Sequence, residues 1–424
     1  MIGNILIVSW QITRRCNLEC QYCLTGSSPS LNADKELSTE ECFSVIEKLK
    51  LSFPDCMLIL TGGEPLLRND IFEICKRASK NLFTVIGSNG TSLTKGIVLK
   101  LKDYNIRGIS INIDSLSHNN EFERRVLSKK LNSIRFLQEE KFPFIINTTI
   151  HKWNITELDE IAEFAYSNAA FSLNLFSLVP AGRGHSLYDL TSSEYDYVVS
   201  NLLDIKEKYN GRLTINTKCA PYIVRHTLED PKNLKAYEGS GGCPAATNYL
   251  CITPGGEVLP CPFFPLNASG GNIKEKSFNQ IVDSKIFAEL RKRNLKGRCG
   301  QCELSYVCSG CRARAFIVSG DYLGEDPLCP YIPKGGNKLK EETIIEKGVT
   351  LYGYKKCEET NIKWTDEAED RIKKIPYFIR GMVIEKIETR AEKIGIEVID
   401  SENLDRIRKK LSGLPIFKRF RKDP

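Results

Sequence analysis

Three cysteines near the start of the chain have a spacing that suits metal chemistry. Cys16, Cys20 and Cys23 form the pattern C-x3-C-x2-C directly after an apolar run. Three thiolates on one loop can hold three irons of an iron–sulfur cubane and leave the fourth iron open, whereas a structural zinc ion takes four protein ligands. The spacing therefore favours a cluster with an open iron; zinc or a chance grouping is the alternative.

A second group of cysteines lies further along the chain, among many glycines and prolines. The chain has 16 cysteines, and the start MIGNILIVSW is interpreted as a strand rather than a signal peptide, so metal or redox chemistry is favoured over disulfides. A zinc ribbon is the alternative to further iron–sulfur clusters. The members of this group are Cys243, Cys251, Cys261, Cys299, Cys302, Cys308, Cys311 and Cys329.

The remaining candidate ligands are expected to be structural. Four cysteines are isolated or have apolar neighbours, which is typical of small buried hydrophobic residues. The histidines form no ligand spacing. These residues are Cys42, Cys56, Cys75, Cys357, His118, His151, His185 and His226.

Over residues 1–180, short apolar runs alternate with helical stretches, and polar and glycine residues follow the apolar runs. Six βα units in succession predict an α/β fold with a parallel sheet, open or curled into part of a barrel, and chemistry at the carboxyl ends of its strands. The predicted strands are Ile5–Trp10, Met57–Thr61, Phe83–Ser88, Gly108–Ile113, Phe144–Ile150 and Ser172–Val179. The candidate site residues at their ends are Gly62, Gly63, Glu64, Ser88, Asn89, Asn112, Asp114 and Arg183.

Composition excludes several classes of protein. Hydrophobic residues make up 41% and charged residues 27%, and no stretch of about 18 apolar residues occurs, so we expect no membrane span. The net charge of +7 is mild and dispersed, which argues against nucleic acid as a partner. Exposed clusters would need a reducing environment, so we expect a cytoplasmic protein.

Changes in composition divide the chain into predicted parts. They are a core over 1–185, a bridge over 186–240, a cysteine-rich domain over 241–333, a polar linker over 334–362, a small helical domain over 363–412 and a basic tail over 413–424. The helical domain is expected to include a helix start at Pro376 and a last helix capped by Ser401.

The first motif resembles the signature of the radical S-adenosylmethionine (SAM) superfamily, with an aromatic residue, Tyr22, before the last cysteine. That resemblance implies a partial (β/α)6 TIM-type barrel, a catalytic [4Fe–4S] cluster and a SAM-derived 5′-deoxyadenosyl radical. It implies that Gly62, Gly63 and Glu64 hold the amino group of SAM and that Ser88 and Asn89 lie near its ribose and carboxylate. Asn112 and Asp114 would lie near the ribose, although the fourth strand departs from the family pattern; a capped turn is the alternative there.

The second group resembles the SPASM extension of that superfamily, which implies one or two auxiliary [4Fe–4S] clusters. Its middle run has two residues before the last cysteine where the family has three. By analogy, the first cluster would use Cys299, Cys302, Cys308 and Cys329. The second would use Cys243, Cys261, Cys311 and either Cys251 or Cys219.

Segments such as Tyr249–Pro262 and Gly310–Ala315 are similar to the haem d1 biosynthesis and didecarboxysiroheme deacetylase family. The resemblance implies a tetrapyrrole substrate with a carboxylated side chain. From its residue type, Arg183 in a glycine-rich loop would bind that carboxylate. We expect an electron donor such as ferredoxin or flavodoxin. The end of the chain resembles the helical domain of a protochlorophyllide reductase subunit. A peptide-modifying enzyme is the runner-up; it is less favoured because the chain begins at its first strand without a recognition domain. A non-catalytic electron carrier is the third reading.

Overall fold

The computed structural model describes residues 7–32, 34–117, 121–184, 190–209, 212–225, 242–338 and 362–373, and parts of 383–410. Its centre is a ten-stranded sheet in the order β10-β9-β8-β1-β2-β3-β4-β5-β6-β7. The strands are β1 Ile7–Thr13, β2 Met57–Gly62, β3 Phe83–Ser88, β4 Ile109–Asn112, β5 Phe144–Ile150, β6 Ser172–Ser177, β7 Thr214–Lys218, β8 Tyr249–Ile252, β9 Glu257–Leu259 and β10 Gly271–Asn272.

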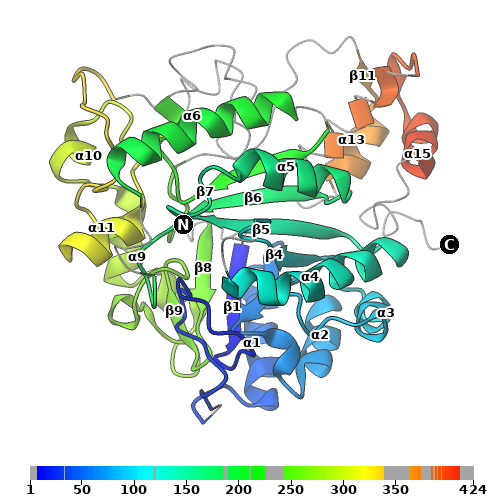
Figure 1. The fold of residues 1–424 in the computed structure, drawn as a ribbon, viewed down its shortest axis with the longest axis horizontal. Coiled ribbons are helices and arrows are strands. Elements are labelled where there is room, and N and C mark those ends of the chain that lie inside the picture. The colour runs from blue at the N-terminus through cyan, green and yellow to red at the C-terminus, as the bar shows by residue number, and fades with distance from the viewer. Residues whose placement is uncertain are drawn as a thin grey trace.

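The six predicted βα units are present as β1 to β6, each followed by a helix that packs along the sheet (Figure 1). Neighbouring strands from β8 through β1 to β7 pair in parallel, and β9 and β10 are antiparallel. The sheet is open at β10 and β7, so the prediction of an α/β partial barrel is confirmed. The helices are α1 Thr39–Ser52, α2 Ile71–Ser79, α3 Lys95–Asp103, α4 Glu121–Glu139, α5 Leu158–Ser167 and α6 Ser192–Lys208.

Two parallel strands extend the sheet beyond the predicted six. Strand β7 lies in the segment interpreted as an aperiodic bridge, and β8 lies in the cysteine-rich segment and pairs with β1. The sequence did not predict β7, because Thr214, Asn216 and Lys218 lie on one face of the strand. These polar residues weaken the apolar pattern from which a strand is recognised. The cysteine-rich segment also holds more helix than expected: α8 Phe278–Val282, α9 Lys285–Lys292, α10 Gly297–Gln301 and α11 Arg312–Ser319.

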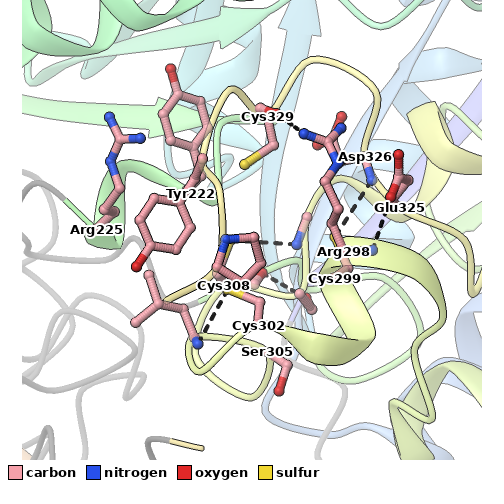
Figure 2. A pocket seen from close by; sticks show the side chains of 15 residues that line it. Tyr222, Arg225, Arg298, Cys299, Cys302, Ser305, Cys308, Glu325, Asp326 and Cys329 are labelled. Carbon is pink, nitrogen blue, oxygen red and sulfur yellow. Dashed lines mark hydrogen bonds and ion pairs between the residues drawn. The ribbon is translucent and has the colours of Figure 1, made fainter. Parts of the chain in front are cut away.

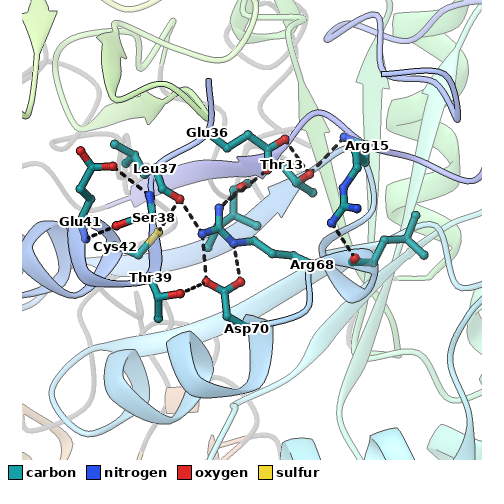
Figure 3. Close-up of polar contacts among 12 residues, drawn as sticks. Thr13, Arg15, Glu36, Leu37, Ser38, Thr39, Glu41, Cys42, Arg68 and Asp70 are labelled. Carbon is teal, nitrogen blue, oxygen red and sulfur yellow. Dashed lines mark hydrogen bonds and ion pairs between the residues drawn. The ribbon is translucent and has the colours of Figure 1, made fainter. Parts of the chain in front are cut away.

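The buried guanidinium of Arg68 ties the first two βα units together (Figure 3). It donates to the carbonyls of Ile12 at 2.8 Å and Leu37 at 2.6 Å, and pairs with Asp70 at 2.7 Å. The carbonyls belong to β1 and to the turn before α1, while Asp70 precedes α2. This network fixes where the chain leaves β1, which is where the first cysteine motif begins.

A separate small core lies at the other end of the described chain, across the sheet from α10 and α11 (Figure 1). It is built from β11 Lys363–Trp364, α13 Asp366–Lys373, β12 Val398–Ile399 and α15 Ser401–Lys410. Arg371 pairs with Asp405 at 2.7 Å, joining its two helices. The predicted last helix is present, but the prediction that Ser401 caps it is wrong: Ser401 is the first residue of α15, and the carboxylate of Asp400 accepts the amide of Asn403 at 2.7 Å. Pro376, Cys357, the tail over 413–424 and all but residues 334–338 and 362 of the linker lie outside the described residues. No helix in the described part of the chain is long and apolar enough to cross a membrane.

Candidate active site and cysteine clusters

The loop after β1 carries the first cysteine motif and is closed by backbone hydrogen bonds. The amide of Cys16 donates to the carbonyl of Ser28 at 3.3 Å, which joins the two ends of the loop. Inside it, the amide of Cys23 donates to the carbonyl of Cys20 at 3.2 Å. Cys16 is buried, whereas Cys20 and Cys23 are half-buried. The loop therefore presents three thiols from one short, internally bonded segment.

Hydrogen-bond donors are aimed at the sulfur of Cys16. The amide of Leu18 lies 3.4 Å from Sγ, and the side-chain amide of Asn89 lies 3.7 Å from it. Burial raises the pKa of this thiol, whereas a bound metal ion favours the thiolate. N–H donors to sulfur stabilise the charge that a reduced iron–sulfur cluster gains.

This donor set fits an iron–sulfur cluster. Among the described residues, no group of three or more His, Cys, Asp or Glu side chains is arranged to hold a metal ion, so the fit rests on the chemistry of the three thiols. Each thiolate of a cubane binds a different iron, so its ligands do not converge on one point. The three loop cysteines, with the donors at Cys16, match that chemistry.

The end of β2 packs against the chain that leads into this loop. A Cβ atom on Gly62 would lie 2.4 Å from the carbonyl oxygen of Thr13, and one on Gly63 would lie 2.2 Å from that of Arg15. Gly62 also has φ +135, a backbone conformation that favours glycine. The amides of Gly63 and Glu64 donate to those two carbonyls at 2.8 Å each. Both glycines are therefore required to bring the ends of β1 and β2 together.

The carboxylate of Glu64 is fully buried and joins β2 to β3. It accepts hydrogen bonds from the hydroxyl of Ser88 at 3.0 Å, the amide of Asn89 at 2.8 Å and the amide of Leu66 at 3.1 Å. Burial raises its pKa to about 7 despite these donors. The carboxylate is thus held at the sheet edge beside the cluster loop. The binding of a SAM amino group by Glu64 stays a prediction.

Glu64 should make the stability of the folded chain depend on pH. Its folded pKa of about 7 lies above the ordinary value of 4.5, so in that range the folded state holds a proton that the unfolded chain has released. Stability should therefore fall as pH rises from about 4.5 to 7, by at most about 3 kcal/mol at 1.36 kcal/mol per pKa unit. Urea unfolding of the metal-free chain at pH 5 and 7.5 should show a larger loss for the wild type than for Glu64→Gln. Equal losses would contradict the assignment.

The end of β4 also connects to the cluster loop. The buried carboxylate of Asp114 accepts a hydrogen bond from the hydroxyl of Tyr22 at 3.0 Å and from the amide of Thr149 at 2.6 Å. Burial raises its pKa. The ring of Tyr22 contacts that of His151, with centroids 4.9 Å apart. Asp114 therefore orients the aromatic residue of the cysteine motif. The predicted contact of Asp114 with the ribose of SAM stays a prediction, and so does that of Asn112.

Arg183, in the turn that follows β6, supports the cluster loop directly. Its guanidinium donates to the carbonyl of Cys20 at 2.9 Å and to that of Ser27 at 2.7 Å. Its backbone amide donates to the carbonyl of Cys23 at 2.9 Å. These contacts make Arg183 a positioning residue for the loop, a role that the sequence did not indicate. Binding of a substrate carboxylate by Arg183 stays a prediction.

Gly182, next to Arg183, lies in close contact with the backbone of the cluster loop. It has φ +60, and a Cβ atom there would lie 2.3 Å from the carbonyl oxygen of Leu24 and 2.4 Å from that of Cys23. Gly182→Ala should push the cluster loop away and lower the formation of 5′-deoxyadenosine from SAM by roughly 10- to 100-fold. Gly26→Ala is the matched control, because Gly26 has φ +63 with no atom within 4 Å of the added Cβ. Equal effects of both changes would mean that backbone strain, not the contact, is responsible.

Four cysteines of the second group line one pocket (Figure 2). N–H donors point at three of their sulfurs: the amide of Asp326 lies 3.5 Å from Cys299, that of Leu304 lies 3.4 Å from Cys302, and that of Gly310 lies 3.4 Å from Cys308. The guanidinium of Arg312 adds a donor to Cys299 at 3.7 Å. The members are Cys299, Cys302, Cys308 and Cys329, the set predicted to share one cluster. The donors at sulfur fit that assignment.

A second set of cysteines lies next to the first. The thiols of Cys219 and Cys311 form a hydrogen bond, which raises the pKa of Cys219 and lowers that of Cys311. Cys243, which is half-buried, and Cys261, which is buried, both interact electrostatically with Cys311. Cys251 instead lies on β8, opposite Ser9 of β1. Of the two alternatives for the fourth ligand, the geometry favours Cys219.

A buried ion pair joins the two sets of cysteines. Arg314 and Asp326 are almost inaccessible and lie 3.3 Å apart. Asp326 also accepts from the amide of Cys311 at 2.7 Å, while Arg314 donates to the carbonyls of Leu178 at 2.8 Å and Cys219 at 3.4 Å. The pair therefore connects both sets to the end of β6. Nothing in the cysteine spacing indicates it, because its two members are charged residues outside the motif.

Comparison with known proteins identifies the class of this one. Residues 10–165 match the radical SAM superfamily, residues 243–303 match the iron–sulfur cluster-binding (SPASM) domain, and residues 364–408 match the protochlorophyllide reductase 57 kD subunit. Streptococcus suis SuiB has a similar structure, with a TM-score of 0.62 at 16% identity over 78% of each chain, which shows a shared fold. The C-terminal resemblance expected from the sequence is also present.

Three similar proteins are enzymes whose names state a reaction. An AdoMet-dependent heme synthase of Methanosarcina barkeri is 34% identical over 77% of this chain and 97% of its own length. A pre-heme d1 synthase of Dinoroseobacter shibae is 28% identical over 76% and 85% of the two chains, and a PqqA peptide cyclase of Rhizobium meliloti is 28% identical over 75% and 85%. The chain belongs to the radical SAM family and carries the SPASM extension. It is an enzyme whose cofactors are [4Fe–4S] clusters and SAM, which excludes the reading as a non-catalytic electron carrier.

Proposed function

We propose that this enzyme takes a hydrogen atom from a carboxylated side chain of a tetrapyrrole and thereby modifies or removes that side chain. The observation that carries the proposal is the 34% identity to an AdoMet-dependent heme synthase over nearly the whole length of that relative. The similarity to a pre-heme d1 synthase supports the same substrate class.

The residues divide into three tasks. When bound, the reduced cluster supplies the electron that splits SAM into methionine and a 5′-deoxyadenosyl radical. Cys16, Cys20 and Cys23 would hold that cluster, while Arg183 and Asp114 keep their loop in place. The candidate SAM residues lie at the carboxyl ends of β2 to β4, beside the loop: Gly62, Gly63, Glu64, Ser88, Asn89, Asn112 and Asp114.

Eight of the nine other ligand candidates would hold two auxiliary clusters. The first would use Cys299, Cys302, Cys308 and Cys329, and the second Cys219, Cys243, Cys261 and Cys311. Cys251 would then be a core residue. We expect a small electron carrier such as ferredoxin or flavodoxin to reduce the enzyme.

A ribosomally made peptide is the second candidate substrate. The specific observation in its favour is the 28% identity to a PqqA peptide cyclase over 85% of that relative. The identity is lower than that to the heme synthase, so we place this candidate second.

Anaerobic incubation of the reconstituted enzyme with dithionite, SAM and one tetrapyrrole tests the proposal. Siroheme, didecarboxysiroheme and Fe-coproporphyrin III form the three arms, and 5′-deoxyadenosine and tetrapyrrole mass are followed together. Loss of side-chain mass in proportion to 5′-deoxyadenosine in any arm is the expected result. Cleavage of SAM with every tetrapyrrole unchanged would contradict the proposal and favour the peptide.

A further inference from the structure

A row of asparagine side chains crosses the inner face of the sheet. Asn112, Asn147, Asn174 and Asn216 are in register on β4 to β7 and are half-buried. The side-chain amide of Asn216 donates to the carbonyl oxygen of Asn174 at 2.9 Å, and that of Asn174 donates to Asn147 at 2.9 Å. This face is therefore polar and remains partly accessible, whereas the opposite face of the same strands is buried.

Lys218 lies on that face, one row closer to the carboxyl edge of the sheet. Side chains two apart on a strand share a face, so Lys218 lies on the same side as Asn216. It is half-buried, and within the described part of the chain its ammonium makes no hydrogen bond or ion pair. The thiol of the adjacent Cys219 interacts electrostatically with this ammonium, and a positive charge withdrawn from water is stabilised further when a ligand supplies an anionic group.

An aromatic residue lies opposite Lys218 on the neighbouring strand. Phe176 on β6 is the register partner of Lys218 on β7, and it is half-buried on the same inner face. Among the described residues it is not part of the hydrophobic core or of the residues that pack against it. An accessible aromatic surface next to an unpaired cation suits a flat, apolar ring system that carries an anionic group.

The distance along the sheet suits a large substrate. Lys218 on β7 is three strands away from β4, where Asn112 is a candidate for contact with SAM, and strands are spaced about 4.8 Å apart. The separation along the sheet is therefore about 14 Å. A tetrapyrrole with extended side chains can cover that span, with one side chain near the radical source and another at β7.

We propose that Lys218 binds a peripheral carboxylate of the tetrapyrrole whose ring lies over Phe176, a site that anchors the substrate away from the reacting side chain. This inference rests on the proposed function, since it needs a tetrapyrrole as the substrate. A charge-assisted hydrogen bond of this kind contributes about 1.5–3 kcal/mol, which corresponds to roughly a 10- to 100-fold change in affinity.

A binding titration without SAM or reductant tests the site separately from catalysis. The reconstituted full chain is titrated with Fe-coproporphyrin III and with its methyl ester, and binding is followed by the Soret absorbance. Lys218→Met should weaken binding of the free acid by roughly 10- to 100-fold and leave binding of the ester unchanged, while Lys218→Arg should largely restore binding of the acid. Lys208→Met is the control, because Lys208 is exposed on α6 and pairs with Asp159 at 3.3 Å.

The possible outcomes separate the two proposals. If the wild type binds neither compound, the tetrapyrrole assignment itself is overturned. If the wild type binds the acid and Lys218→Met binds it equally well, only the Lys218 site is overturned. The same holds if Lys218→Met weakens acid and ester alike or alters the electron paramagnetic resonance signal of the clusters. In that case Lys218 supports the neighbouring Cys219 segment and not the ligand.

Discussion

Replacing Cys16 with alanine should reduce SAM cleavage to background. Cys16 is the buried member of the three loop cysteines and accepts hydrogen bonds from Leu18 and Asn89 at its sulfur. Without it, the loop offers two thiolates to a cluster that needs three protein ligands to keep one iron open. We expect 5′-deoxyadenosine formation to be lost and the bound iron to fall by one cluster. Chromatography of the nucleoside and an iron assay on the same sample measure both effects.

Cys75→Ala is the matched control for this change. Cys75 is also buried, but it lies on α2 inside the hydrophobic core, away from either cysteine group. Its replacement should cost about 1 kcal/mol of stability and leave SAM cleavage intact. If Cys16→Ala kept its activity, or lost no more than Cys75→Ala, the catalytic cluster would have to lie elsewhere.

Replacing Asp326 with asparagine should produce the largest loss of stability in the cysteine-rich region. The change removes the carboxylate charge that pairs with the buried guanidinium of Arg314, and removing one partner of a buried ion pair typically costs about 3–5 kcal/mol. One carboxylate oxygen of Asp326 also accepts the amide of Cys311 at 2.7 Å, and its backbone amide donates to Cys299 at 3.5 Å. We therefore expect iron of both auxiliary sites to be lost along with the fold around them. Thermal unfolding and iron content measure these effects.

The neighbouring residue provides the control. Glu325 pairs with Arg298 at 3.2 Å, but both side chains are about two-fifths exposed, and exposed pairs contribute roughly 0–1 kcal/mol. Glu325→Gln should therefore change the unfolding temperature little and keep the iron. An Asp326→Asn protein as stable and iron-rich as Glu325→Gln would show that the buried pair does not hold the two sites together.

Local pattern was sufficient for much of the fold. Strand β5 has the bounds that its sequence predicts, and a capping box of Ser38 and Glu41 marks the start of α1. These elements are visible in the sequence because the periods of burial and the caps involve residues only a few positions apart. Strand β7 was missed because its accessible face bears Thr214, Asn216 and Lys218, and a polar inner face weakens the apolar alternation.

The sequence by itself determined the chemistry of this enzyme, because the three loop cysteines and the glycines at the end of β2 are set by spacing within short segments. Only the tertiary structure decided how distant segments combine. It brought Cys219 to Cys311, left Cys251 on β8 opposite Ser9, and directed the guanidinium of Arg183 to the cluster loop. Such contacts join residues far apart in the chain, as the 163 positions between Arg183 and Cys20 show. They depend on which strand ends meet at one edge of the sheet, and no local pattern of residues encodes that arrangement.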